Sequence, residues 1–227
     1  MKRLLAILLI ITISVTILIS SIENNTYNKD YYIKSFQENG VVEVTGKSIS
    51  ELGTIVDSTI EYLKGNGYDE LLIPFFNDRE VAHMRDVQDL FDIARTIKYI
   101  TLVSSIILIA YFAISEGTKK AGRKLFFGLF ANHIIIILMS IIIYVDFSRF
   151  WTFFHHIFFV NDLWLLNPKT DLMIQMLPEP FFSGIIIKIV LSFFINLSIL
   201  QLAGVYFMKR GKGKWEIEKK LRKDIWS

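Results

Sequence analysis

Residues 125–145 read LFFGLFANHIIIILMSIIIYV, a run without Asp, Glu, Lys or Arg. About 20 helical residues cross the hydrocarbon core of a bilayer, which is about 30 Å thick. Three further apolar runs occur at 4–20, 99–115 and 183–208 in a chain of 227 residues without cysteine. The sequence therefore predicts an all-α membrane protein with four transmembrane helices. The missing cysteines exclude disulfide scaffolds and cysteine nucleophiles.

The charges between these runs predict the orientation. The N-terminus, the connection 116–124 and the tail 209–227 hold 14 basic and 4 acidic residues, whereas 21–98 and 146–182 hold 10 basic and 18 acidic residues. Because basic flanks stay in the cytoplasm, both termini are expected there. The predicted organisation is four transmembrane helices (1–21, 99–115, 125–145, 183–208), an extracytoplasmic cap (22–98), a cytoplasmic loop (116–124), an aromatic-rich extracytoplasmic segment (146–182) and a basic cytoplasmic tail (209–227).

The first apolar run has two interpretations. Lys2 and Arg3 form a basic start of the kind that also precedes a cleaved signal peptide. The apolar stretch is longer than a usual signal core, and 19–22 is a poor cleavage site. We therefore expect an uncleaved membrane anchor.

The cap sequence predicts a short extended piece at 41–45 and a helix at 49–64. Ser48 and Glu51 have the spacing of a capping box, and Gly65 follows as a stop signal. The buried stripe of this helix is predicted to be Leu52, Ile55, Val56, Thr59 and Leu63. A second helix, capped by Asn77 or Asp78, leads into the second span. Its amphipathic pattern predicts that it lies over the membrane surface.

Three histidines lie in the outer segments. His83 shares a helical face with Glu80 and Asp86, so a carboxylate could orient its ring or raise its pKa. His155 and His156 lie in a segment in which ten of 37 residues are Phe or Trp. Adjacent side chains point in different directions, so at most one of this pair should face a given site.

The outer segments fit more than one function. The aromatic residues fit a belt at the lipid headgroups or a lipid-lined pocket. Converging histidines with nearby acids suit general acid–base catalysis, because imidazole titrates near neutral pH. They also suit a zinc site with a carboxylate ligand, although the spacing matches no known metal motif. No hydrolase or phosphate-binding motif is present.

Two blocks resemble a known family. Residues 80–87 read EVAHMRDV, and residues 154–164 read FHHIFFVNDLW, followed by Asp171. Both are similar to signatures of the bacterial lipoprotein intramolecular transacylases, which also have four spans and an outward cap. Asn167 departs from the acid expected before Pro168, which concerns a peripheral contact.

The resemblance implies an acyltransferase of the bacterial cytoplasmic membrane with its active site on the extracytoplasmic side. Its substrates would be diacylglyceryl-modified lipoproteins, whose sn-2 acyl chain moves to the α-amino group of the N-terminal cysteine. The implied catalytic residues are His83 and His155, with His155 the base and His83 the proton donor or oxyanion partner, or the reverse. The expected supporting residues are Glu80, Asp86, Asp162 and Asp171, and the expected substrate-binding residues are Met84, Phe154, Phe158, Phe159 and Trp164.

We expect no cofactor, no metal and no nucleic-acid partner. Membrane lipid is an expected partner. The basic residues are divided among three juxtamembrane pieces, as expected for topology anchors near anionic lipid rather than for a nucleic-acid surface. Two alternatives are a non-catalytic membrane cap or partner protein and a zinc-dependent membrane hydrolase.

Overall fold

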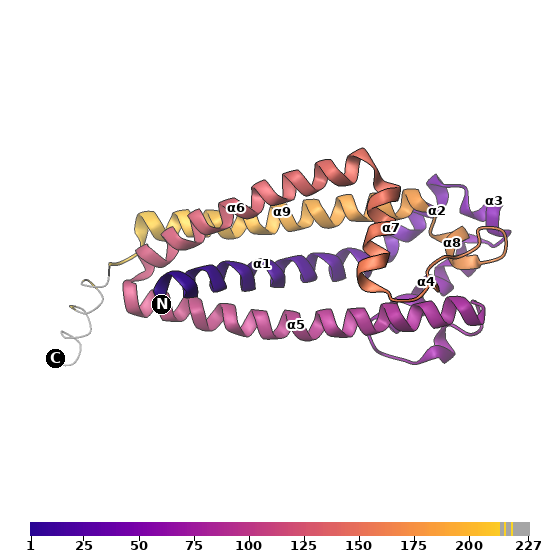
Figure 1. The fold of residues 1–227 in the computed structure, drawn as a ribbon, viewed down its shortest axis with the longest axis horizontal. Helices are drawn as coiled ribbons and strands as arrows, with labels where there is room; N and C mark the ends of the chain where they lie inside the picture. Colours follow the sequence, from indigo (N-terminus) through magenta and orange to yellow (C-terminus); the bar gives the residue numbers. More distant parts are fainter. Residues whose placement is uncertain (214–215, 217–218, 220–227) are drawn as a thin grey trace. The chain divides into compact units, whose positions relative to one another are not determined.

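The computed structural model describes residues 1–213, 216 and 219, and these residues contain helices and turns but no β-strand (Figure 1). Four helices are long and apolar enough to cross a membrane: α1 (Lys2–Thr26), α5 (Asp78–Glu116), α6 (Thr118–Val145) and α9 (Glu179–Arg210). The prediction of an all-α membrane protein with four such helices is confirmed. Of the predicted basic tail, residues 214–215, 217–218 and 220–227 lie outside the described residues.

One compact unit comprises residues 1–20, 97–140 and the segment from 190 onward. Its buried core takes side chains from all four long helices, among them Leu9, Phe112, Leu129 and Leu197. Gly122 and Gly204 let α6 and α9 approach closely, because a Cβ on Gly122 would lie 2.7 Å from the Gly204 carbonyl oxygen. Small residues serve this purpose in membrane helix pairs.

Polar side chains in this unit pair between helices. Asn132 Nδ2 donates to Ser14 Oγ at 2.7 Å and joins α6 to α1. His133 Nε2 lies 3.1 Å from Ser198 Oγ, and Gln201 Nε2 donates to the Phe126 carbonyl at 2.9 Å, so both join α6 to α9. Away from water such groups need partners, and these hydrogen bonds provide them.

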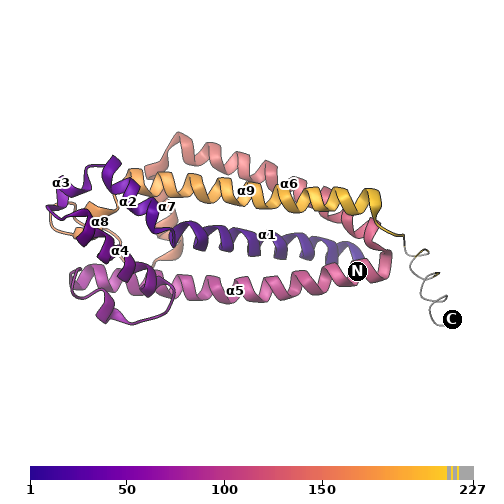
Figure 2. The same ribbon diagram turned by 180° about the vertical axis from the view of Figure 1, so that it is seen from behind.

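The second compact unit comprises residues 21–96 and 141–189. It contains the short helices α2 (Lys29–Glu38), α3 (Val41–Thr45), α4 (Ile49–Leu63), α7 (Phe147–Phe158) and α8 (Leu172–Met176), and a 3₁₀ turn at Asp69–Leu71. Figure 2 shows α2, α3, α4 and α8 grouped together. Its core includes Phe36, Leu52, Leu72 and Phe181. The unit therefore has a hydrophobic core of its own.

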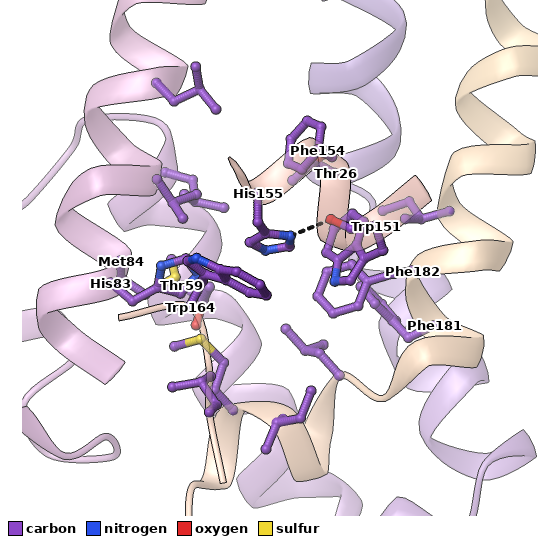
Figure 3. A pocket seen from close by; sticks show the side chains of 18 of the residues that line it. Thr26, Thr59, His83, Met84, Trp151, Phe154, His155, Trp164, Phe181 and Phe182 are labelled. Atoms are coloured by element: carbon purple, nitrogen blue, oxygen red, sulfur yellow. Dashed lines mark hydrogen bonds between the residues drawn. The ribbon is translucent and has the colours of Figure 1, made fainter. Parts of the chain in front are cut away.

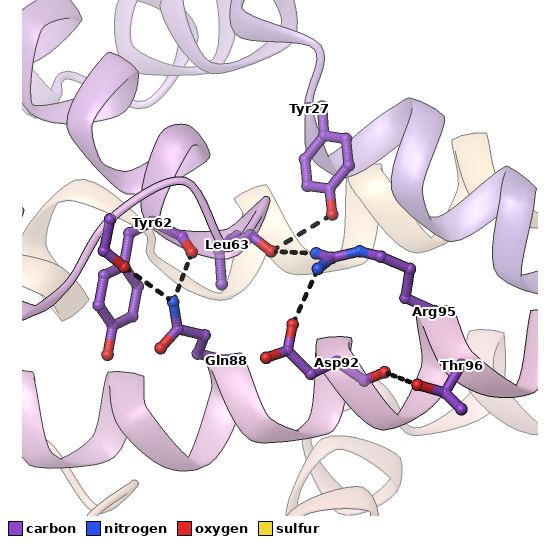
Figure 4. A network of polar contacts seen from close by, with 8 residues as sticks. Tyr27, Tyr62, Leu63, Gln88, Asp92, Arg95 and Thr96 are labelled. Carbon is purple, nitrogen blue, oxygen red and sulfur yellow. Dashed lines mark hydrogen bonds and ion pairs between the residues drawn. The ribbon is translucent and has the colours of Figure 1, made fainter.

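Helix α4 follows the sequence prediction closely. Ser48 and Glu51 form the capping box, and all five residues of the predicted stripe are buried. Gly65 has a φ of 77°, a left-handed conformation that favours glycine after a helix end. Side chains of α5 also close this end (Figure 4): Arg95 donates to the Leu63 carbonyl and Gln88 to the Tyr62 carbonyl, both at 2.8 Å. A cation is favourable at a helix C-terminus, so Arg95 holds α4 against α5.

Three local predictions were wrong. Residues 41–45 are not extended but form helix α3, because Gly40 and Gly46 at its ends adopt left-handed φ values of 64° and 67°. The predicted surface helix is instead the start of α5, which continues unbroken to Glu116 and has no glycine or proline to break it. Helix α6 begins at Thr118, directly after Gly117, so most of the predicted loop 116–124 is helical.

Candidate active site

The second unit contains a cavity of about 380 Å³. Its lining is almost entirely aromatic and aliphatic and comes mainly from α1, α2, α4, α5, α7, α8, α9 and the segment between α7 and α8. His83, His155 and Trp164 contribute the ring nitrogens discussed below (Figure 3). A mostly apolar pocket with a few polar groups is a usual form of a ligand site.

Helix α7 directs His155 into this cavity. Asp146 caps the helix by accepting from Arg149 N–H at 2.9 Å, and His155 is 5% exposed near its end. Nδ1 of His155 lies 2.7 Å from the Trp151 carbonyl oxygen, which can only accept. Nδ1 therefore carries the proton, and Nε2 of the neutral ring is an acceptor. His156, the next residue, is exposed and does not line the cavity.

Helix α5 directs His83 into the same cavity. Asn77 caps the helix: its side chain accepts from Glu80 N–H at 3.1 Å, and Glu80 accepts from the Asn77 backbone N–H at 2.8 Å. One turn on, His83 is 8% exposed, and its Nδ1 is buried without a hydrogen-bond partner among the described residues. The centres of the His83 and His155 rings are 6.3 Å apart.

Burial shifts both imidazoles toward the neutral form. His83 lies in the polar first part of α5, ahead of the apolar stretch at 99–115. Its apolar surroundings, and secondarily His155, lower its pKa to about 4. Burial also lowers the pKa of His155, while the hydrogen bond to Trp151 opposes that change. Both rings are therefore neutral at pH 7, which suits a base at His155 Nε2 and a neutral N–H donor at His83.

The predicted carboxylates at the start of α5 hydrogen-bond to groups other than His83, although the charge of Asp86 acts to raise the pKa of that histidine. Both oxygens of Glu80 are occupied, one by Asn77 N–H and the other by Met173 N–H at 2.6 Å. Glu80 is 1% exposed, and this burial raises its pKa. Asp171 accepts from Asn167 N–H at 2.7 Å, which lowers its pKa, and from Asn77 Nδ2 at 3.1 Å. Glu80 and Asp171 therefore join the α5 N-terminus to α8 and the loop before it.

The other two predicted acids lie where α5 meets the loop that carries Trp164. Asp86 accepts from Asn161 Nδ2 at 2.9 Å instead of holding His83. Asp162 is exposed, and its carbonyl, rather than its carboxylate, accepts from the Arg79 guanidinium. The two contacts come from residues on either side of His83 along α5, so that helix holds both His83 and the Trp164 loop.

Four of the five predicted binding residues line the cavity: Met84, Phe154, Phe159 and Trp164. Phe158 does not line it; this residue is 49% exposed and packs on Phe154, 4.8 Å between ring centres. Trp164 stacks on His155 at 4.6 Å, and Phe159 lies 5.3 Å from His83.

Sequence reasoning missed the roles of Trp151, Arg79 and Asn161. Trp151 was visible only as one of many aromatics, yet its carbonyl selects the His155 tautomer. Its position four residues before His155 would have indicated that contact, had residues 147–158 been identified as a helix. Arg79 and Asn161 act through loop geometry, which no local pattern encodes.

The described residues offer no cluster of three His, Asp or Glu side chains arranged to hold a metal ion. The available donors around the cavity are instead imidazole and indole nitrogens and a few hydroxyls in an apolar lining. These features define a class: a helical membrane protein with two neutral histidines at an apolar cavity, suited to proton transfer on a lipid-like substrate.

Comparison with known proteins gives the family. The model of the family "Lipoprotein intramolecular transacylase Lit" matches residues 7–182. The chain therefore belongs to the lipoprotein intramolecular transacylase family and is an acyltransferase of the membrane. No match was found among curated proteins.

Solved structures show the same fold. One is the membrane integral lipoprotein intramolecular transacylase Lit from Bacillus cereus, with a TM-score of 0.83 and 23% identity over 92% of this chain and 97% of that one. Two others are variants of that protein with a histidine replaced by arginine or alanine. Both have TM-scores of 0.78 and 23% identity over 92% of this chain, and cover 93% and 94% of theirs. At this identity the likeness establishes the fold.

Proposed function

We propose that the protein moves the sn-2 acyl chain of a diacylglyceryl-lipoprotein to the α-amino group of its N-terminal cysteine. The product carries an N-acyl chain and an S-monoacylglyceryl group. Family membership supports the reaction type. The observation that carries the mechanism is the pair of buried imidazoles 6.3 Å apart, with the His155 tautomer fixed by Trp151.

The nucleophile and the ester belong to one substrate molecule, so no acyl-enzyme is needed. The protein must fold a flexible substrate until amine and carbonyl meet. Holding reactants in such a geometry supplies about 7–11 kcal/mol of a barrier. The cavity is suited to this task, because its apolar lining can accept hydrocarbon chains. The predicted side chains that line it, Met84, Phe154, Phe159 and Trp164, would contact the acyl chain or glyceryl group.

His155 is the base in this proposal. The α-amine, whose pKa is near 8 in water, reacts as the free base, and its nitrogen must lose one of its two protons to become an amide. Nε2 of His155 accepts that proton as the C–N bond forms, and the Trp151 carbonyl stabilises the resulting imidazolium through Nδ1–H. The proton then passes to the glyceryl oxygen as the C–O bond breaks. One residue therefore acts first as base and then as acid.

His83 is the electrostatic partner. With a pKa near 4, His83 is almost entirely neutral at pH 7, so it is a poor general acid. A neutral imidazole can still donate an N–H hydrogen bond to the oxygen that becomes negative when the amine attacks. This physical argument favours one of the two assignments that the sequence left open: base at His155 and donor at His83.

We further propose that the cavity faces the extracytoplasmic side and that both termini are cytoplasmic. The charge difference between the two sets of connections supports this orientation. The described part of the second unit would then form an extracytoplasmic cap where the lipoprotein's polypeptide leaves the membrane.

The test uses the purified full chain and a synthetic S-diacylglyceryl-cysteinyl peptide. Product and substrate are isomers, so tandem mass spectrometry must locate an acyl chain on the N-terminal cysteine. We expect His155→Gln to reduce conversion by about 10²–10⁴-fold, because general base catalysis contributes about that factor. The matched control, His156→Gln at the exposed neighbour, should remain active. Conversion retained in His155→Gln would refute the assignment.

The same assay separates the zinc hydrolase alternative. A hydrolase releases a fatty acid and lowers the mass of the peptide, whereas the transacylase conserves the mass. We expect full conversion after incubation with a chelator. Loss of conversion that returns on addition of zinc would support the hydrolase-type site instead.

A further inference from the structure

Trp164 has a buried hydrogen-bond donor without a partner. Its indole Nε1 is inaccessible to solvent and makes no hydrogen bond to any described residue. The indole lines the cavity and stacks on His155, with 4.6 Å between ring centres and 29° between planes (Figure 3). An unpaired buried donor is costly, so each such group in a native structure requires an explanation.

The loop around Trp164 is held in place rather than loosely packed. Asn161 uses Oδ1 to accept from Leu163 N–H at 3.0 Å and Nδ2 to donate to Asp86. Leu166 N–H donates to the Trp164 carbonyl at 3.0 Å. Arg79 donates to the Asp162 carbonyl. The contacts to Asp86 and Arg79 join the loop to the helix that carries His83, and the stacking on His155 orients the indole.

We propose that Trp164 is a catalytic residue whose indole N–H donates to the oxyanion formed on the sn-2 carbonyl oxygen. This inference rests on the proposed function. A donor on a loop held by hydrogen bonds and surrounded by an apolar lining is suited to this task, because preorganised donors stabilise developing charge in such surroundings. Its contact with His155 places the donor beside the base that receives the amine proton.

The step balances without a further reactant. The amine nitrogen forms a bond to the carbonyl carbon, and the carbonyl π electrons move to the oxygen. Trp164 N–H and His83 N–H donate to that oxygen, and neither gives up its proton. When the tetrahedral centre collapses, the electron pair re-forms the C=O bond, the bond to the glyceryl oxygen breaks, and that oxygen takes the proton held by His155.

The sharpest test changes a single atom. Replacing Trp164 with β-(3-benzothienyl)alanine substitutes sulfur for N–H and keeps the ring size and the stacking on His155. Removing one oxyanion donor lowers kcat by about 10²–10³-fold in enzymes of this kind. We expect a loss of about that size, with KM within a few-fold of the wild type and an unchanged melting temperature. A residue that only packs would change KM or stability instead.

A second variant guards against misfolding. With 5-fluorotryptophan at position 164 the N–H is retained as a stronger donor, so kcat should equal or exceed that of the wild type. A benzothienyl variant with wild-type kcat would overturn the role of Trp164, although the proposed function would stand. Wild-type protein that forms no N-acyl product would instead refute the proposed function itself.

Discussion

The imidazole rings of His83 and His155 lie 6.3 Å apart at their centres and are tilted by 33°. One ring is at the start of a long helix and the other is near the end of a short one. Phe159 contacts both, at 5.3 Å from His83 and 5.6 Å from His155. Both rings line the same cavity at this separation, so the two can act on the same reacting carbonyl.

The pH dependence of kcat should report His155. This residue must be neutral to accept a proton, and burial lowers its pKa below the usual 6.5. A lowered pKa extends the neutral form to lower pH, so the midpoint of the acid fall in kcat should lie below pH 6.5. The value of kcat/KM should also rise toward about pH 8, as the free substrate amine deprotonates. A pH series with the synthetic peptide measures both.

His83→Gln provides the control for that series. Because the pKa of His83 is about 4, its charge does not change near pH 6. We expect this variant to lower kcat without moving the pH at which kcat declines. A large displacement of the acid limb in His83→Gln would assign the titrating base to His83 instead.

Local signals carried most of what the sequence predicted. The four apolar runs, the Ser48 capping box and the stripe of α4 depend on spacing along one helix, and all agree with the structure. The prediction of an extended piece at 41–45 was wrong, because it gave the β-branched residues more weight than the two flanking glycines. The separate surface helix was wrong, because amphipathic character alone cannot indicate where a helix breaks.

The site was only partly predictable, because local sequence signals do not determine tertiary packing. The sequence indicated His83 and His155, but their distance depends on tertiary packing. Glu80 and Asp86 share a helical face with His83, which predicted direct contacts. In the structure, the backbone N–H groups of Asn77 and Met173 donate hydrogen bonds to the Glu80 carboxylate. The Asn161 side chain donates to the Asp86 carboxylate. Residues outside α5 therefore compete for carboxylates that helical spacing assigns to the histidine.

Glu80 should act as a positioning residue. Its carboxylate accepts backbone hydrogen bonds with both oxygens, and glutamine can accept with only one of its two terminal atoms. Glu80→Gln leaves one buried N–H unpaired, which costs about 1–3 kcal/mol. We expect a lower melting temperature and a reduced kcat, with the pH of the acid limb unchanged. Glu70→Gln, at an exposed carboxylate, is the matched control and should behave as wild type. An unaltered melting temperature in Glu80→Gln would contradict the role.

The proposed orientation can be measured with single cysteines, because the natural chain has none. Glu43 and Lys120 are both exposed, and they lie in segments assigned to opposite sides of the membrane. In intact cells a membrane-impermeant maleimide should label Glu43→Cys and should label Lys120→Cys only after permeabilisation. The reverse pattern would invert the topology and place the cavity on the cytoplasmic side.

The hydrogen bond between Asp86 and Asn161 should couple α5 to the Trp164 loop. Asp86→Ala and Asn161→Ala each remove the same 2.9 Å contact, so either should lower kcat by loosening the loop. The double variant should be little worse than the poorer single variant, since interacting residues show non-additive effects. A hydrogen bond to a charged group contributes about 1.5–3 kcal/mol, an upper bound on the coupling. The control cycle uses Lys29 and Asp57, an exposed ion pair at 2.5 Å, whose removal should leave kcat unchanged. Additive losses at Asp86 and Asn161 would mean that the two residues act separately and that another contact fixes the loop.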